Sequence, residues 1–339
     1  MLSKIKVIVI GLGQIGLEVC KLILQKKSLL LQAVVDIDPN KTGKDLGEFL
    51  YTKKKIKTLG IPVEIDLQKV IRELQPEVAI ITTKSKLPEI ANDIFTCIEN
   101  HISVISSCEE LVYPFVSYPE LSNELDKKAK ENFVQILGTG VNPGFIMDSL
   151  PLFLTSVCFN VKSIEIERTV DLKKRRKALQ IKAGLGLSPK EFYKLVKNKV
   201  IGHVGLIESG YFISDYLNMK ISNFKESIKP IIAKSEIKAK YFTISKGKVS
   251  GFIHKCEGLY GNKKVISLKL IFNSESSENF DSIIIKGEPN IHIRIENGIH
   301  GDIATVAMMV NCIPNLLHSR FGLITMKELS LPSIINPSK

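Results

Sequence analysis

Residues 5–16 read Ile-Lys-Val-Ile-Val-Ile-Gly-Leu-Gly-Gln-Ile-Gly, an apolar run that leads directly into the spacing Gly-x-Gly-x-x-Gly. The run predicts a buried strand over residues 6–10, and the apolar positions that follow predict a helix over residues 14–25. A glycine motif of this kind is weak evidence by itself. Here it joins a strand to a helix, which is the context that dinucleotide binding requires.

Each position of the motif has a physical role in such a turn. Gly11 permits the tight turn, Gly13 lets the backbone approach a pyrophosphate, and Gly16 lets the helix pack against the strand. The first helical residues, Gln14 and Ile15, would offer backbone N–H groups and the positive end of the helix dipole to a phosphate. The alternative is a glycine turn with a structural role alone.

Asp36 ends the next apolar run, 25 positions after Gly11. A carboxylate at the end of the second strand can bind the hydroxyl groups of an adenosine ribose. It favours NAD over NADP because it repels a 2′-phosphate. Lys41 and Lys44 lie close enough in sequence to weaken this preference.

The first 140 residues alternate strand-like and helix-like patterns, which predicts a parallel sheet with right-handed crossovers, a Rossmann-type doubly wound α/β domain. The expected strands are residues 6–10, 31–36, 61–64, 78–82, 103–107 and 133–137. The expected helices are residues 14–25, 67–74, 87–98 and 119–130.

The pattern changes after Gly138-Thr139-Gly140. Helices are expected over residues 145–155, 188–197 and 204–217, and strand-like runs over residues 163–170 and 223–294, mostly antiparallel. We therefore expect an α+β domain with a mixed or antiparallel sheet for substrate binding and dimerisation over residues 141–300, after a dinucleotide-binding domain over residues 1–140. An apolar helix over residues 303–318 is expected to bring residues 301–339 back onto the first domain.

Polar residues follow two of the expected parallel strands. Thr82-Thr83 ends one, and Glu109-Glu110 follows another. Ligands of doubly wound sheets bind at the carboxyl ends of the strands, so the threonines are candidates for cofactor contacts. The glutamates are candidates for general acid–base work. Alternatively, one of them is a first-turn residue that the helix dipole favours.

A turn-rich stretch, Gly138-Thr139-Gly140-Val141-Asn142-Pro143-Gly144-Phe145, comes directly after the last expected strand of the first domain. Asn142 offers both a donor and an acceptor there, so it is a candidate substrate-binding residue. A hinge without ligand contact is the alternative.

The most basic segment begins at Arg168 and continues as Lys173-Lys174-Arg175-Arg176-Lys177. Arg168 lies inside an alternating strand, where its charge needs a partner such as a carboxylate. The run has no interleaved aromatic residues and no nucleic-acid-binding motif, so a solvated loop or a loop over an anionic substrate is favoured over nucleic acid. His203 and His254 could face a substrate or be structural, and the six histidines lack metal-ligand spacing.

Composition further narrows the classes of protein and of ligand that fit the sequence. Lys and Arg outnumber Asp and Glu by 47 to 35, a net charge of +12 that favours anionic ligands. The six cysteines are scattered without a CxxC pair, which favours the reducing cytoplasm over a disulfide framework or a zinc ribbon. No apolar stretch is long enough for a membrane span.

The chain resembles the family of 2,4-diaminopentanoate dehydrogenase and native amine dehydrogenases nearly from end to end. The stretches that carry the resemblance are Asp36–Pro39 with Asp45–Glu48, Cys108–Leu111, Gly138–Phe145, Arg175-Arg176, Gly184–Ser188, Gly202–Leu206, Gly301–Thr305, Asn311–Pro314 and Gly322–Met326. The chain is also distantly similar to dihydrodipicolinate reductase. It lacks that enzyme's paired histidines and its Ser-Gly-Thr-Ala loop, which argues against tetrahydrodipicolinate synthesis.

The resemblance implies an NAD- or NADP-dependent, reversible oxidative deamination of 2,4-diaminopentanoate to 2-amino-4-oxopentanoate and ammonia, as in ornithine degradation, by a homodimer. It implies a proton shuttle at Glu109 or Glu110 and substrate contacts at Asn142, Arg168 and His254. No metal is expected, because the histidines lack ligand spacing. The alternatives are a dehydrogenase of another small amine, ketone or hydroxy acid, and a nucleotide-binding protein without catalysis.

Overall fold

The computed structural model describes residues 4–51 and 57–335. Contacts divide the chain into two compact units. The first unit contains the residues up to Gly144 together with those from Gly301 onward, and the second unit is Phe145–His300. The turn around Asn142 therefore groups with the first unit.

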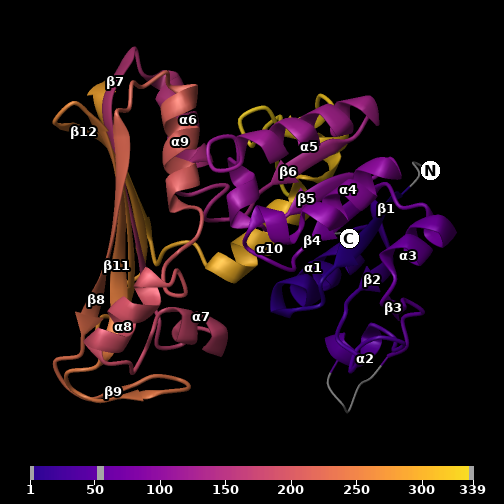
Figure 1. The fold of residues 1–339 in the computed structure, drawn as a ribbon, viewed down its shortest axis with the longest axis horizontal. Helices are drawn as coiled ribbons and strands as arrows, with labels where there is room; N and C mark the ends of the chain where they lie inside the picture. The colour runs from indigo at the N-terminus through magenta and orange to yellow at the C-terminus, as the bar shows by residue number, and fades with distance from the viewer. Residues whose placement is uncertain (1–3, 52–56, 336–339) are drawn as a thin grey trace. The chain divides into compact units, whose positions relative to one another are not determined.

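The first unit is built on a seven-stranded sheet in which every pair of neighbours is parallel (Figure 1). In spatial order the strands are β15 (Gly322–Ile324), β6 (Gln135–Gly138), β5 (Ser103–Ser106), β4 (Val78–Ile81), β1 (Ile5–Ile10), β2 (Leu29–Val35) and β3 (Val63–Glu64). The chain order reverses between β1 and β4, which is the topological switch point where such sheets bind ligands. The predicted doubly wound fold is confirmed.

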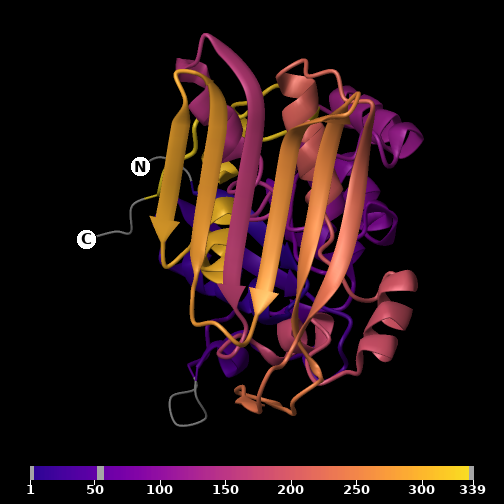
Figure 2. The same cartoon turned by 90° about the vertical axis from the view of Figure 1, so that its left-hand side faces the viewer.

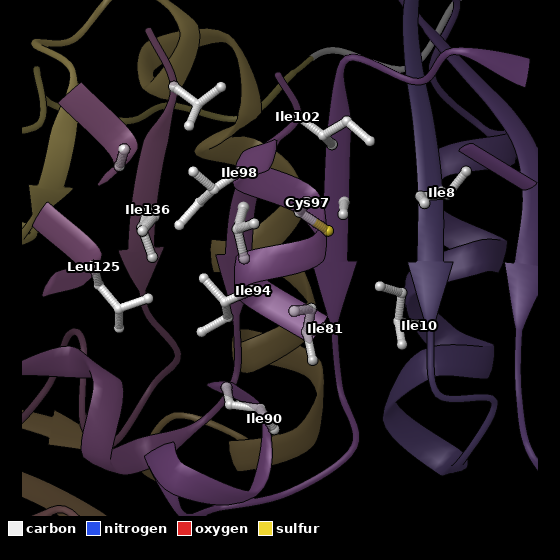
Figure 3. Packing of buried hydrophobic residues seen from close by; sticks show 14 of the residues in the cluster. Ile8, Ile10, Ile81, Ile90, Ile94, Cys97, Ile98, Ile102, Leu125 and Ile136 are labelled. Atoms are coloured by element: carbon white, nitrogen blue, oxygen red, sulfur yellow. The ribbon is translucent and has the colours of Figure 1, made fainter. Parts of the chain in front are cut away.

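Helices cover both faces of this sheet. They are α1 (Gln14–Leu24), α2 (Gly47–Leu50), α3 (Leu67–Leu74), α4 (Ala91–Glu99), α5 (Pro119–Glu131), α10 (Gly301–Asn311) and α11 (Ile313–Leu317), with short 3-10 turns at η1 (Leu87–Glu89) and η2 (Glu109–Val112). Figure 3 shows how Ile94, Cys97 and Ile98 of α4 pack with Leu125 of α5 beside the strands. These strands are buried on both faces, which explains their continuous apolar sequences.

The single helix expected over residues 303–318 is wrong, because the structure has two helices there. The helix α10 ends at Asn311, and α11 begins at Ile313 with Pro314 in its first turn. Proline has no backbone N–H and its ring clashes with the carbonyl four residues earlier, so the helix breaks before it. Pro88 has a similar effect, because the expected helix over 87–98 begins with the 3-10 turn η1.

The second unit is built on a six-stranded mixed sheet. In spatial order its strands are β14 (Ile291–Glu296), β13 (Phe280–Glu288), β7 (Asn160–Asp171), β12 (Lys263–Asn273), β11 (Val249–Tyr260) and β8 (Asn223–Ile232). Only β7 and β12 pair in parallel. The described helices of this unit are α6 (Ser149–Leu154), η3 (Thr155–Val157), α7 (Lys177–Lys182), α8 (Pro189–Lys197) and α9 (Leu206–Tyr216), and β9 (Ile237–Lys238) pairs with β10 (Thr243–Ile244). The expected helix over 145–155 is shorter, since residues 145–148 form a turn.

Figure 2 looks onto the sheet of the second unit from the side that carries no helix among the described residues. On the opposite side, α9 packs on β11, β12 and β8. Residues of β11 alternate accordingly: Phe252, His254 and Cys256 are buried, whereas Ile253 and Lys255 are half-buried. The face of the sheet on which these side chains are buried holds the polar groups described below.

Asp45 ties a surface segment of the first unit to the residues that precede β3, and its carboxylate accepts hydrogen bonds from the N–H groups of Gly47 (2.8 Å), Leu59 (2.9 Å) and Ile61 (3.1 Å). Desolvation of the carboxylate would raise its pKa, but these bonds outweigh desolvation and hold the pKa below its ordinary value of 3.8. The ionised form is therefore the one that stabilises the fold.

We expect Asp45→Asn to lower the free energy of unfolding by about 1–2 kcal/mol at neutral pH. Because the folded pKa is depressed, this contribution is present above the ordinary carboxyl pKa and is lost as the pH falls through the folded pKa. Urea unfolding of both proteins between neutral and acidic pH measures it, with exposed Glu48→Gln as the control. A difference that stays constant down to pH values below 3.8 would contradict this account.

Candidate functional site

The glycine turn lies at the switch point and is packed tightly on one side and open on the other. Gly11 has φ +97°, and a Cβ there would lie 2.8 Å from Cγ2 of Thr83. A Cβ on Gly16 would lie 1.9 Å from the carbonyl oxygen of Gly11, whereas one on Gly13 would meet nothing within 4 Å. The Thr82 hydroxyl donates to the Gly11 carbonyl (2.8 Å) and holds the turn. The two threonines therefore contact the turn itself.

The N-terminus of α1 opens onto the space beside Gly13. Gly13 is the N-cap with an extended backbone, and no side chain caps the helix. The first helical N–H groups, at Gln14, Ile15 and Gly16, have no partner within the helix. No acidic residue lies in the first turn. This arrangement fits the pyrophosphate of a dinucleotide, which a side chain at Gly13 would displace.

Asp36 follows β2 and reaches back to the turn. Its carboxylate accepts the N–H groups of Leu12 (2.6 Å) and Asp38 (2.8 Å). Lys41 forms an ion pair with both Asp36 (3.2 Å) and Asp38 (3.4 Å). Asp36 thus lies where an adenosine ribose would be recognised, but a cation stands beside it. Lys44 instead donates to the Asn40 carbonyl.

Glu109 and Glu110 both lie in η2, directly after β5, and are half-buried. The Glu110 carboxylate accepts the N–H of Leu87 (2.9 Å), which ties η2 to the start of η1. Burial raises the pKa of the adjacent Cys108 to about 12, so its thiol stays protonated. Glu110 therefore has a structural role that its neighbours in the sequence do not indicate, because Leu87 lies 23 residues away.

Asn142 follows β6 at the same edge of the sheet. Its Oδ1 atom is buried and has no hydrogen-bond partner within the described residues. The neighbouring Val141 N–H donates to the hydroxyl of Thr305 on α10 (3.2 Å), so α10 supports this turn. A buried acceptor without a donor costs about 1–3 kcal/mol, which makes it a good place for a ligand donor.

Two predicted site residues of the second unit, Arg168 and His254, lie in one row of paired positions that crosses three strands of its sheet. Arg168 on β7 pairs with Leu270 on β12, which pairs with His254 on β11. Both polar side chains are buried, at 4% and 3% exposure. Two strand spacings separate them by about 10 Å. Sequence spacing could not show this row, because it depends on the strand order.

The Arg168 guanidinium has its carboxylate partner inside the unit. Nη1 donates to both oxygens of Asp281 (3.0 and 3.1 Å), and Nη2 donates to the Ile299 carbonyl. Asp281 also accepts the Ile299 N–H (2.8 Å). The prediction of a carboxylate partner is correct, but that partner belongs to the protein. The expected contact with a substrate carboxylate is not favoured, because the fork of Arg168 is already engaged.

His254 is held on both ring nitrogens. Nδ1 accepts the backbone N–H of His203 (3.3 Å), so Nε2 carries the proton and donates to Glu226 (3.2 Å). Gly205, with φ +99°, is the N-cap of α9 and lies two residues after His203. These bonds match a structural histidine, and its substrate contact stays a prediction.

We expect Arg168→Met to destabilise the protein by about 3–5 kcal/mol, because it leaves the Asp281 carboxylate buried without its cation. The double variant Arg168→Met/Asp281→Leu is expected to recover much of this loss. Urea unfolding measures both. A double variant no more stable than Arg168→Met would contradict this explanation.

Within residues 4–51 and 57–335, no group of three or more His, Cys, Asp or Glu side chains could hold a metal ion. In the same ranges, no helix is long and apolar enough to cross a membrane.

Comparison with known proteins agrees with these features. Residues 145–338 match the family described as the 2,4-diaminopentanoate dehydrogenase C-terminal domain, and residues 3–110 match the CoA binding domain family. A 2,4-diaminopentanoate dehydrogenase of Acetoanaerobium sticklandii is 34% identical over 343 residues, covering 98% of this chain and 96% of that protein.

Solved structures share the fold at lower identity. An amine dehydrogenase of Mycobacterium smegmatis has a TM-score of 0.86 at 21% identity, covering 100% of this chain and 99% of that chain. A dihydrodipicolinate reductase of Paenisporosarcina sp. TG-14 has a TM-score of 0.53 at 13% identity, covering 94% and 97%. The resemblance inferred from the sequence is confirmed, and with it the expectation of an oxidoreductase. The chain belongs to the 2,4-diaminopentanoate dehydrogenase family.

Proposed function

We propose that the protein catalyses the NAD- or NADP-dependent oxidative deamination of 2,4-diaminopentanoate to 2-amino-4-oxopentanoate and ammonia, and the reverse reductive amination. The observation that carries this proposal is the similarity to a 2,4-diaminopentanoate dehydrogenase along 98% of the chain. The glycine turn, Glu109 and Asn142 supply chemistry that suits the reaction.

The dinucleotide would be held at the switch point of the first unit. The N–H groups at the start of α1 would bind its pyrophosphate, and Asp36 would bind its adenosine ribose. Once bound, the nicotinamide would accept a hydride at C4. NAD is favoured because Asp36 repels a 2′-phosphate, although Lys41, 3.2 Å away, weakens that repulsion.

Glu109 is proposed as the proton shuttle. The substrate ammonium must lose a proton before its carbon can release hydride, and water must lose a proton when it attacks the resulting iminium carbon. One carboxylate can accept the proton in both steps if it releases the first proton to solvent in between, and it can then give the proton taken from water to the nitrogen that leaves as ammonia. Glu110, whose carboxylate accepts the Leu87 N–H, is the alternative shuttle. The Asn142 Oδ1 acceptor would bind an N–H of the substrate.

A test measures reduction of NAD⁺ and NADP⁺ by the purified protein with 2,4-diaminopentanoate, and the ammonia requirement of the reverse reaction. Turnover that releases ammonia would support the proposal. Reduction of a ketone without ammonia would indicate a hydroxy-acid or related dehydrogenase instead. Tight binding of NADH without turnover of any amine would indicate a protein that binds nucleotide without catalysis.

A homodimer through the open sheet face of the second unit is also proposed. This face carries half-buried apolar side chains, such as Ile253 and Ile271. Beside them lie cross-strand ion pairs such as Lys269–Glu167 (2.9 Å). Paired charges are cheaper to bury than single ones. Light scattering during gel filtration measures the mass, and a monomer at micromolar concentration would contradict the proposal.

A further inference from the structure

The turn over residues 139–144 is fixed at its start by the backbone around it. A Cβ on Gly138 would lie 2.4 Å from the carbonyl carbon of Leu111, so the end of β6 packs backbone to backbone against η2. The Thr139 N–H donates to the Ser106 carbonyl (2.9 Å), which extends the pairing with β5 by one residue. The turn therefore leaves the sheet at a defined position beside η2.

The middle of this turn is held by Thr305 of α10. The Val141 N–H donates to the Thr305 hydroxyl oxygen (3.2 Å). A Cβ on Gly140 would lie 3.5 Å from Cγ2 and Oγ1 of Thr305, so the helix lies directly against the turn. Because Val141 is buried, its N–H has little access to water and needs an acceptor in the protein. The Thr305 hydroxyl supplies this acceptor.

Asn142 is the next residue along the turn, and its buried Oδ1 atom has no hydrogen-bond partner among the described residues. An acceptor that is held in place before a ligand arrives loses little conformational entropy on binding. The bond from Val141 to Thr305 fixes the backbone from which the Asn142 side chain starts. This bond therefore contributes to the preorganisation of the acceptor.

The helix that carries Thr305 is also connected to the proposed dinucleotide site. Within the first unit, α10 packs against α1, whose first N–H groups would bind the pyrophosphate (Figure 1). Thr305 therefore ties the turn to the same framework that would hold the dinucleotide.

We propose that Thr305 is a positioning residue, whose hydroxyl holds the Val141 backbone and thereby presents Asn142 Oδ1 to an N–H group of the substrate. The inference rests on the proposed function, because it explains how this chain orients the acceptor that would bind the diamino acid. Thr305 acts through the backbone of the turn, so its loss should weaken substrate binding through Asn142.

The test replaces Thr305 by valine, which has nearly the same shape but no hydroxyl acceptor. With 2,4-diaminopentanoate and saturating dinucleotide, we expect Thr305→Val to raise KM about tenfold and to change kcat less than about threefold. KM is the constant affected, because the Asn142 contact would be equally strong in the ground state and in the transition state. Thr305→Ser keeps the hydroxyl, and its KM should stay within about twofold of the wild-type value.

A double-mutant cycle separates positioning through Asn142 from a general structural role. Asn142→Leu removes the Oδ1 acceptor at nearly constant size and is itself expected to raise KM. In that background, Thr305→Val should raise KM less than about twofold, so that most of the tenfold effect, equivalent to about 1.4 kcal/mol, is lost. Effects of the two substitutions that simply multiply in the double variant would overturn the inference.

The matched control is Thr96→Val, which removes the hydroxyl of a half-buried threonine on α4 of the same unit. We expect it to change KM less than about twofold. Hydrogen exchange of the turn, followed by mass spectrometry, should become faster in Thr305→Val but not in Thr96→Val or Thr305→Ser. Unchanged exchange in Thr305→Val would overturn the inference. If the wild-type protein releases no ammonia from 2,4-diaminopentanoate, the proposed function fails, whereas the exchange result still decides whether Thr305 holds the turn.

Discussion

Replacing Glu109 by Gln is expected to lower kcat for amine oxidation by about 10²–10⁴-fold while leaving dinucleotide binding nearly unchanged. Glutamine has nearly the same shape as glutamate but cannot accept a proton at neutral pH. The two proton transfers would then depend on water. Steady-state kinetics with saturating NAD⁺ measures the loss of kcat, and fluorescence titration with NADH measures binding.

Glu110→Gln is the matched control, because it is the adjacent residue and loses the same charge. The amide oxygen of glutamine can still accept the Leu87 N–H that Glu110 accepts at 2.9 Å. We therefore expect a loss of less than about tenfold in kcat. If Glu110→Gln loses more activity than Glu109→Gln, the shuttle is Glu110 and the assignment is wrong.

The parts of the fold that depend on neighbouring residues could be predicted from the sequence. The run of residues 5–16 predicts a strand, a turn and a helix, and the structure has β1, the turn and α1 there. The helix over residues 67–74 is correct at both ends, because Asp66 caps it and its apolar residues repeat with helical spacing. Pro314 is likewise a local signal, and it divides the single helix expected over residues 303–318 into α10 and α11.

The parts of the site that depend on tertiary contacts could not be predicted. Asp281, the partner of Arg168, is 113 residues away in the sequence. Leu87, the partner of Glu110, is 23 residues away. Arg168 and His254 share a row only because β12 lies between their strands. Periodicity fixes which side of a strand a residue faces, but register and strand order decide which side chains meet.

The second large effect is expected at Gly13. A Cβ there would meet no atom of the described structure within 4 Å, and the backbone is extended, with φ −76°. Valine is therefore expected to change the free energy of unfolding by less than about 0.5 kcal/mol. Its side chain would nevertheless fill the space beside the N–H groups of α1. We expect NADH affinity to fall at least about a hundredfold, or about 2.8 kcal/mol.

Gly16→Val separates this effect from simple misfolding. A Cβ at Gly16 would lie 1.9 Å from the Gly11 carbonyl, so the helix would have to move away from the strand. We expect that variant to lose about 1–3 kcal/mol of stability or more, together with binding. Gly13→Val should lose binding alone, as measured by titration calorimetry and urea unfolding on the same samples. A stable Gly13→Val protein that binds NADH as tightly as the wild type would show that the phosphates bind elsewhere, because a valine side chain and a pyrophosphate cannot occupy the same space.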